Sequence, residues 1–171
     1  MLSGRILVVA FEGWNDATEA ASGAVKAIAE QIQAMTIDAV DPEDYYDFQF
    51  SRPMLELDED GNRTLSWPGT ELMQASKEQI SKIPALDDLS LLIGTEPSRR
   101  WLSFAAEVLE MVQDREIDPV IMLGAMLADV PHTIPMQVSR SSQNPPLRDL
   151  FDLDPFRYGG PVGIPTRWAH A

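Results

Sequence analysis

The amino-acid sequence predicts a three-layer α/β fold, in which helices flank a mostly parallel sheet, with a small antiparallel hairpin excursion. The first observation is a set of continuous apolar runs at residues 6–11, 88–94 and 118–124, which is typical of strands covered on both faces. The second is that the first two runs are each followed by a loop and a segment with helical periodicity. Buried strands that alternate with amphipathic helices imply right-handed crossovers and a helix-covered sheet.

The first strand and the first helix are predicted on either side of the loop FEGWND, residues 11–16. Residues 6–11 form the strand, and the apolar positions after the loop recur every three or four residues, which places them on one helix face. Asn15 or Asp16 is a suitable N-cap, and Glu19 is favourably placed in the first turn. The predicted helix face consists of Ala21, Val25, Ile28, Ile32 and Met35.

The middle of the chain predicts short elements. Residues 37–40 are a candidate strand, and residues 41–48 form an acidic loop rich in aromatic side chains. Two short segments, 53–57 and 63–67, flank a turn that contains a glycine, a pattern that predicts a β-hairpin.

Two more helices are predicted beyond the second apolar run, and a third begins near the end of the chain. The short ones are expected at residues 147–151 and from residue 165 onward. The longer helix, which follows residues 95–100, has an apolar face of Trp101, Ala105, Val108 and Val112.

The 171 residues are most simply one domain, because a chain of this length buries about 70% of its unfolded surface.

The composition excludes several classes of partner and chemistry. Acidic residues outnumber basic ones by 27 to 13, and the net charge of -14 repels nucleic acid and anionic membranes. The absence of cysteine excludes disulfides, thiolate nucleophiles and Cys-ligated zinc. The apolar run near the N-terminus is too short to span a membrane and carries no signal-type cleavage site. The simplest localisation is therefore the cytoplasm.

Three loops are expected to meet at one edge of the sheet. FEGWND at residues 11–16, TEPSRR at 95–100 and ADVPHT at 128–133 each follow a predicted strand. The carboxyl ends of parallel strands share one edge, where ligands bind in the crevice between the loops. The candidate cleft residues are Glu12, Trp14, Asn15, Asp16, Glu96, Arg99, Arg100, Asp129, His132 and Thr133.

The loop FEGWND also has a purely structural interpretation. Gly13 permits a positive φ, Trp14 can cap the core, and Asn15 or Asp16 can cap the following helix. The sequence leaves the structural and the binding roles of these residues open.

The two arginines of TEPSRR are expected to need a negatively charged partner. Arg99 and Arg100 lie in a first helical turn, where positive charge opposes the helix dipole. An ion pair with Glu12 or Glu96 satisfies them, and an anionic ligand is the alternative.

The pair Asp129 and His132 is the best candidate for chemistry, without being assigned a catalytic role. A carboxylate that orients an imidazole is half of a general-base system, for which Thr133 or a serine is the nucleophile. No G-x-S-x-G elbow supports a nucleophile, and no H-E-x-x-H spacing supports a metal site. The alternative is a structural or interface histidine.

No cofactor is expected, and aromatic residues suggest an interface. The sequence contains neither a G-x-x-x-x-G-K-[ST] loop nor a G-x-G-x-x-G fingerprint. Tyr45, Tyr46 and Phe48 lie in the acidic loop, and exposed aromatics mark interfaces. The alternative is that these rings fold inward over the sheet edge.

Several of these segments resemble one known family. Together they run from the N-terminus to about Gly163 in the order that the family has them, and several are long and unusual in composition. They are similar to the bacterial branch of the proteasome assembly chaperone family, second type. The segments are AFEGWNDA (10–17), DPEDYYDFQ (41–49) followed by Arg52-Pro53, Trp67-Pro68, GTEPSRRW (94–101) and LGAMLADVPHT (123–133).

The resemblance implies a fold akin to the phosphorylase/hydrolase-like class and a tendency to self-associate. In eukaryotic members it implies assistance to the assembly of proteasome α-subunits, without catalysis. Some bacterial members carry an ATP-grasp or carboxylate-amine ligase label, which no phosphate-binding loop supports in this sequence. Compared with the family, this sequence is expected to lack the last helix and strand.

These observations predict a non-catalytic, cytoplasmic protein similar to an assembly chaperone. It is expected to bind protein partners, such as proteasome-like subunits, and to form a homo-oligomer, with no nucleic acid, membrane or cofactor involved. The alternative is a small-molecule-binding enzyme, of the hydrolase or ligase type, that uses the same cleft.

Overall fold

A computed structural model of the chain describes residues 4–169, apart from 59, 85, 114 and 156. The chain divides into two compact units, which are described separately: residues 1–126 with 162–171, and residues 127–161. Along the chain the elements are β1 (Gly4–Glu12), a 3-10 turn (Ala17–Glu19), α1 (Ala20–Gln31), β2 (Met35–Ala39), α2 (Pro42–Tyr45), β3 (Met54–Leu57), β4 (Arg63–Ser66), β5 (Thr70–Gln74), α3 (Lys77–Ile80), β6 (Leu86–Thr95), α4 (Trp101–Gln113), β7 (Val120–Met122), α5 (Pro145–Phe151) and α6 (Ile164–Ala169).

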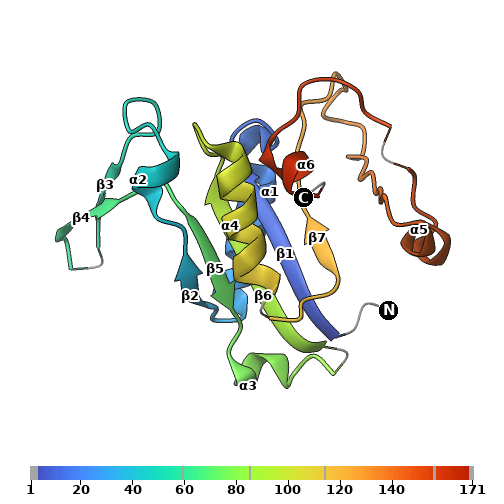
Figure 1. The fold of residues 1–171 in the computed structure, drawn as a ribbon, viewed down its shortest axis with the longest axis horizontal. Helices are drawn as coiled ribbons and strands as arrows, with labels where there is room; N and C mark the ends of the chain where they lie inside the picture. Colours follow the sequence, from blue (N-terminus) through green and yellow to red (C-terminus); the bar gives the residue numbers. More distant parts are fainter. Residues whose placement is uncertain (1–3, 59, 85, 114, 156, 170–171) are drawn as a thin grey trace. The chain divides into compact units, whose positions relative to one another are not determined.

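The first unit is built on a five-stranded sheet in the order β2-β5-β6-β1-β7 (Figure 1). Strand β1 runs parallel to both of its neighbours, with Val8 opposite Leu91 of β6 and Ile121 of β7. Strand β5 is antiparallel to β6 and to β2. Four of the five strands therefore share one direction, and the predicted mostly parallel sheet is confirmed.

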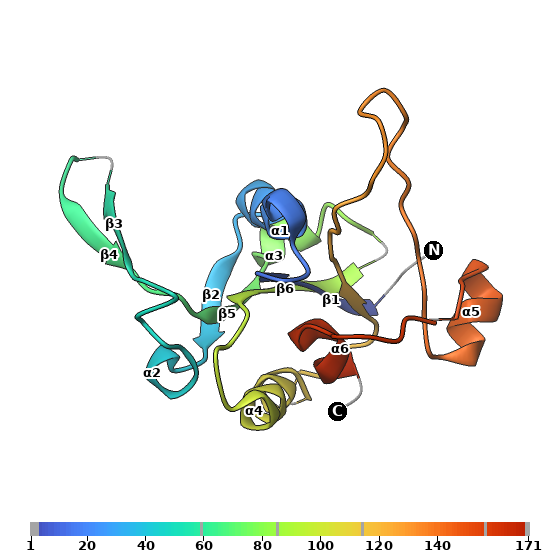
Figure 2. The ribbon, with the colours of Figure 1, turned by 90° about the horizontal axis from the view of Figure 1, so that it is seen from above.

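Helices cover both faces of this sheet, as Figure 2 shows with α1 and α3 on one side and α4 and α6 on the other. Alternate side chains of β1 feed the two cores. Leu7 and Val9 pack in the cluster that includes Phe104 of α4, whereas Ile6 packs with Val25 of α1. The three-layer α/β prediction is confirmed.

Helix α1 is shorter than its apolar periodicity predicted. It ends at Gln31, and Gln33 takes a positive φ of 50° that leaves the helical path. Met35, which the periodicity assigned to the helix face, instead begins β2 and is exposed.

The β-hairpin was predicted correctly, but β5 was missed. In the hairpin, β3 and β4 pair antiparallel with Leu55 opposite Leu65. Between the hairpin and β6, β5 has only five residues, and Thr70 and Leu72 are its fully buried side chains. So short a run, half polar, gives a weak strand signal.

The acidic loop folds its two tyrosines inward. Tyr45 packs edge-on against Phe104, with ring centroids 5.3 Å apart. The Tyr46 hydroxyl donates to the Thr95 carbonyl at 2.8 Å and lies 3.0 Å from Thr70 Oγ1. Both tyrosines are almost fully buried, so the prediction that they form an exposed interface is wrong, because β5 and α4 supply partners that the sequence did not reveal.

Phe48, the third aromatic residue of that prediction, is half-buried and stacks edge-on with Trp67 at 5.0 Å. Burial raises the pKa of Tyr46 to about 12. The tyrosines therefore have a mainly structural role, because they pack the loop against β5, β6 and α4.

The second unit contains α5, the short helix predicted around residues 147–151. Its N-cap is Asn144, whose side chain accepts a hydrogen bond from the Leu147 N–H at 3.3 Å. Over the described parts of both units, no helix is long and apolar enough to cross a membrane.

Candidate functional site

The loops that follow β1 and β6 leave the sheet side by side. The two strands stay paired and parallel as far as their last residues, where Glu12 lies opposite Thr95. The segment after β7 joins them, because the Ala125 N–H donates to the Asn15 carbonyl at 2.7 Å and the Ala17 N–H donates back to Ala125 at 3.0 Å. This part of the predicted loop arrangement is present within the first unit.

Asp16 serves as a helix cap. Its buried carboxylate accepts hydrogen bonds from the Ala21 N–H at 2.7 Å and from the Ser22 hydroxyl at 2.5 Å. These contacts satisfy orphan donors at the start of α1. The structural interpretation of Asp16 therefore holds, and its carboxylate is not free for a ligand.

Trp14, by contrast, is presented to solvent. Its side chain is 69% exposed, so it does not cap the core. The preceding Gly13 has a φ of +120°, and a Cβ there would lie 3.2 Å from the Glu96 Cβ. A residue with a side chain is strained at this φ, so the glycine fixes the turn that exposes the indole.

Glu96 holds the beginning of α6, and Asn15 lies close against it. The Ile164 N–H donates to Glu96 Oε1 at 2.8 Å. A Cβ on Gly163 would lie only 1.9 Å from Asn15 Oδ1, so the backbone approaches both loops closely. Asn15 Oδ1 is buried, and no hydrogen-bond donor reaches it from the residues that the structure describes. Sequence reasoning did not identify residues 163 and 164 as part of this site.

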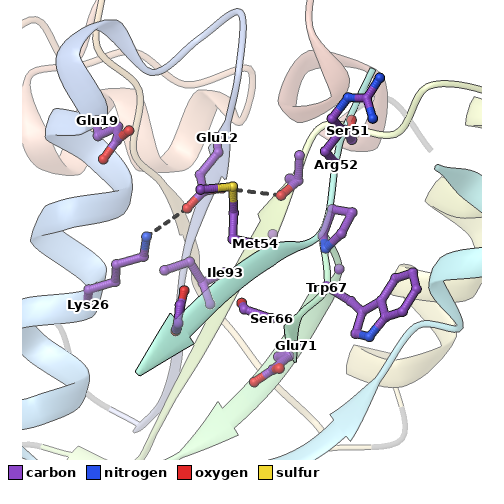
Figure 3. A pocket seen from close by; sticks show the side chains of 15 residues that line it. Glu12, Glu19, Lys26, Ser51, Arg52, Met54, Ser66, Trp67, Glu71 and Ile93 are labelled. Carbon is purple, nitrogen blue, oxygen red and sulfur yellow. Dashed lines mark hydrogen bonds and ion pairs between the residues drawn. The ribbon is translucent and has the colours of Figure 1, made fainter. Parts of the chain in front are cut away.

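Glu12 points into a pocket of about 610 Å³ between α1 and the β3–β4 hairpin (Figure 3). It forms an ion pair with Lys26 at 2.7 Å and accepts a hydrogen bond from the Thr95 hydroxyl at 3.2 Å. The hydrogen bond from Lys26 to Glu12 raises the pKa of Lys26. Six of the other lining residues are Glu19, Arg52, Met54, Glu56, Trp67 and Glu71.

The two arginines bind the acidic loop and not the predicted carboxylates. Arg100 forms an ion pair with Asp44 at 2.5 Å and lies over the Tyr45 ring at 5.3 Å. Arg99 donates to the backbone carbonyl groups of Glu43 and Asp44 at 2.6 and 3.3 Å. The predicted pairing with Glu12 or Glu96 is wrong, because the α2 turn lies closer in the fold than the sequence indicated.

Asp129, His132 and Thr133 belong to the second unit, and all three are exposed. In the described residues of that unit, no hydrogen bond joins Asp129 to His132. Nor do the described residues of the chain contain a cluster of three side chains suited to a metal ion. The proposed acid/base pair thus stays a prediction from the sequence.

Comparison with solved structures identifies several similar chains. A PAC2 family protein from Streptomyces avermitilis is 39% identical, with a TM-score of 0.82, and the match covers 97% of this chain and 68% of that chain. A proteasome-assembly chaperone homologue from Mycobacterium tuberculosis is 38% identical, with a TM-score of 0.79 and coverages of 95% and 67%.

A protein of unknown function from Corynebacterium glutamicum shares the fold, with a TM-score of 0.78 at 22% identity. This chain spans 61% of its length. No curated protein matches the chain. The model of the PAC2 family matches residues 10–168. The chain therefore belongs to the PAC2 family.

Proposed function

We propose that this chain is a non-catalytic, chaperone-like protein that binds protein partners and itself, with the strand-end edge of the first unit as its recognition surface. The single observation that carries the proposal is the exposed indole of Trp14 on a loop whose other residues are tightly held. Tryptophan is enriched among the residues that dominate the binding energy of interfaces. A fixed backbone also lowers the entropic cost of presenting that ring to a partner.

The similar proteins point to the kind of partner. The Mycobacterium tuberculosis structure is that of a proteasome-assembly chaperone homologue. We therefore expect proteasome-like subunits to be the partners of this chain, and a cytoplasmic location agrees with a protein that has no cysteine.

The proposal is tested by retention of purified proteasome α-subunits on the immobilised chain. Trp14→Ala is expected to reduce retention about tenfold or more, because truncation of such an anchor typically costs about 2 kcal/mol or more. Leu102→Ser is the control for the loss of an exposed apolar side chain from another element, since Leu102 is 68% exposed on α4. Equal retention by both variants, or none by the unmodified chain, contradicts the proposal. Sedimentation of the chain alone tests self-association.

One observation favours a second candidate, a small-molecule-binding enzyme. The pocket beside Glu12 and Lys26 has a volume within the range of ligand sites. Asp129 and His132, the acid and base expected from the sequence, belong to the second unit and are tested separately. If they act as that pair, His132→Ala abolishes turnover of any metabolite found to bind. Unchanged turnover in His132→Ala contradicts that role.

A further inference from the structure

Helix α6 covers part of the strand-end edge, the proposed recognition surface of the first unit. The Ile164 N–H donates to Glu96 Oε1 at 2.8 Å. A Cβ on Gly163 would lie 1.9 Å from Asn15 Oδ1 and 2.8 Å from Glu96 Oε1, so the backbone that leads into α6 lies directly against both side chains. A partner that binds at Trp14 therefore meets an edge on which Asn15 and Glu96 are covered by the chain itself.

Apart from this hydrogen bond, α6 is held by apolar packing. It packs against α4 and β1 (Figure 2). Ile164 is fully buried and Trp168 is nearly so, in the same core cluster as Phe104 of α4 and Val9 of β1. The helix has only six residues, and helices shorter than about 12 residues are not stable in water without tertiary packing. The helical form of α6 therefore depends on its seat in the first unit.

The seat of α6 leaves two polar groups unsatisfied. Asn15 Oδ1 and Trp168 Nε1 are buried without a hydrogen-bond partner, and in the described part of the chain these are the only buried side-chain atoms of this kind. A buried polar group without a partner raises the free energy of the arrangement that buries it, because its hydrogen bonds to water are lost. The hydrogen bond from the Arg167 N–H to the Gly163 carbonyl is also long, at 3.5 Å. Both unpaired atoms therefore favour release of α6.

We propose that α6 is a displaceable strap, which a protein partner held by Trp14 moves away from Glu96 and Asn15 in order to occupy the strand-end edge. The inference rests on the proposed function, because it describes how access to that recognition surface is controlled. A partner that donates N–H groups to Asn15 Oδ1 as well as to Glu96 competes well, since α6 leaves the Asn15 acceptor unpaired. In the free chain, the strap keeps the apolar seat of Ile164 and Trp168 covered.

Hydrogen exchange of the full chain, with and without an excess of purified proteasome α-subunits, measures the release of α6. In the free chain, the amides of α6 are expected to exchange about tenfold or more faster than those of α4, because a strap opens without global unfolding. Bound subunits should slow exchange in residues 11–16 and speed it further in α6. Docking on a permanent surface that includes α6 would slow exchange in both segments.

Gly163→Ala is the variant that releases the strap while it keeps both acceptors. The added Cβ fits only if the Asn15 and Glu96 side chains move aside, which breaks the hydrogen bond from Ile164. Exchange in α6 and retention of α-subunits should both rise about three- to tenfold, because the competing closed state is less populated. Glu96→Ala removes the acceptor and should speed exchange in α6 in the same way, which covers the case in which Gly163→Ala does not fold. Gly23→Ala, whose Cβ meets no atom within 4 Å, is the matched control and should change neither quantity.

Three results overturn the inference. They are exchange in α6 as slow as in α4, slower exchange in α6 when subunits are bound, and unchanged or lower retention by Gly163→Ala although its α6 exchanges faster. Failure of the proposed function is distinguishable. If neither the unmodified chain nor Gly163→Ala retains α-subunits, the proposed function fails, and the exchange rates of the free chains alone decide whether α6 is a strap. If subunits are retained and protect α6, the proposed function stands and the strap is refuted.

Discussion

Replacement of Gly94 by alanine is predicted to force β5 and β6 apart. Gly94 is buried in β6 and lies directly opposite Thr70 of β5, which is fully buried. A Cβ at residue 94 would lie 2.1 Å from the Thr70 Oγ1, 2.8 Å from its Cβ and 3.0 Å from its Cγ2. Rotation of the threonine moves its Oγ1 and Cγ2 but leaves its Cβ too close, so the backbone has to shift.

The cost follows from two contributions. Overpacking of a tight core costs about 1–3 kcal/mol, and displacement of Thr70 from the Tyr46 hydroxyl loses a hydrogen bond worth about 1 kcal/mol. The free energy of unfolding of Gly94→Ala should therefore fall by about 2–4 kcal/mol, a large part of the stability of a typical domain.

Urea unfolding monitored by circular dichroism measures this change. Gly23→Ala is the control, because no atom lies within 4 Å of the added Cβ. Gly23 lies in α1, where alanine should raise stability by about 0.5–1 kcal/mol. Thr70→Ala combined with Gly94→Ala should recover part of the loss. A Gly94→Ala variant as stable as the unmodified chain would refute the close approach of β5 and β6.

Three further predictions concern single side chains. Asp16→Ala should lower the free energy of unfolding by about 1–3 kcal/mol, measured in urea, because it leaves the Ser22 N–H and other N-terminal donors of α1 without an acceptor. Tyr46, with its pKa raised from 10.0 to about 12, holds its proton more tightly in the folded state. The contribution of this hydroxyl to the free energy of unfolding should thus be fully present below pH 10. Between pH 10 and 12 the free energy of unfolding should fall by about 2–3 kcal/mol more than in Tyr46→Phe, measured by urea unfolding at each pH. Arg100→Ala should cost less than about 1 kcal/mol in urea unfolding, because its ion pair with Asp44 is half exposed, and a larger loss would show that the pair holds the α2 turn.

The elements with long periodic patterns could be predicted from the sequence. Strands β1 and β6 have continuous apolar runs, and α4 has a regular apolar face, so their types are clear without knowledge of their neighbours. Strand β5 lacks such a pattern. It is a strand because it pairs with β6 along its full length, and this pairing cannot be seen in the local sequence.

The partners of the site residues were harder to predict than the elements. Arg100 and Asp44 are 56 positions apart, and only the tertiary fold brings them together. The sequence left two roles open for Asp16 and Trp14, and the structure gives them opposite ones, a buried cap and an exposed ring. Local spacing identifies the loop, but burial of each side chain depends on the elements that pack around it.

The contacts of Glu96 bear on the order in which the protein forms during translation. The loops at Asn15 and Glu96 are complete early in synthesis, but the backbone that packs against them, Gly163 and Ile164, leaves the ribosome much later. Residues 127–161 are made in between and form the other unit. The strand-end edge is therefore completed only when this late segment has been synthesised. On a ribosome stalled before residue 163, the Glu96 carboxylate would lack the Ile164 N–H from which it accepts a hydrogen bond in the folded chain.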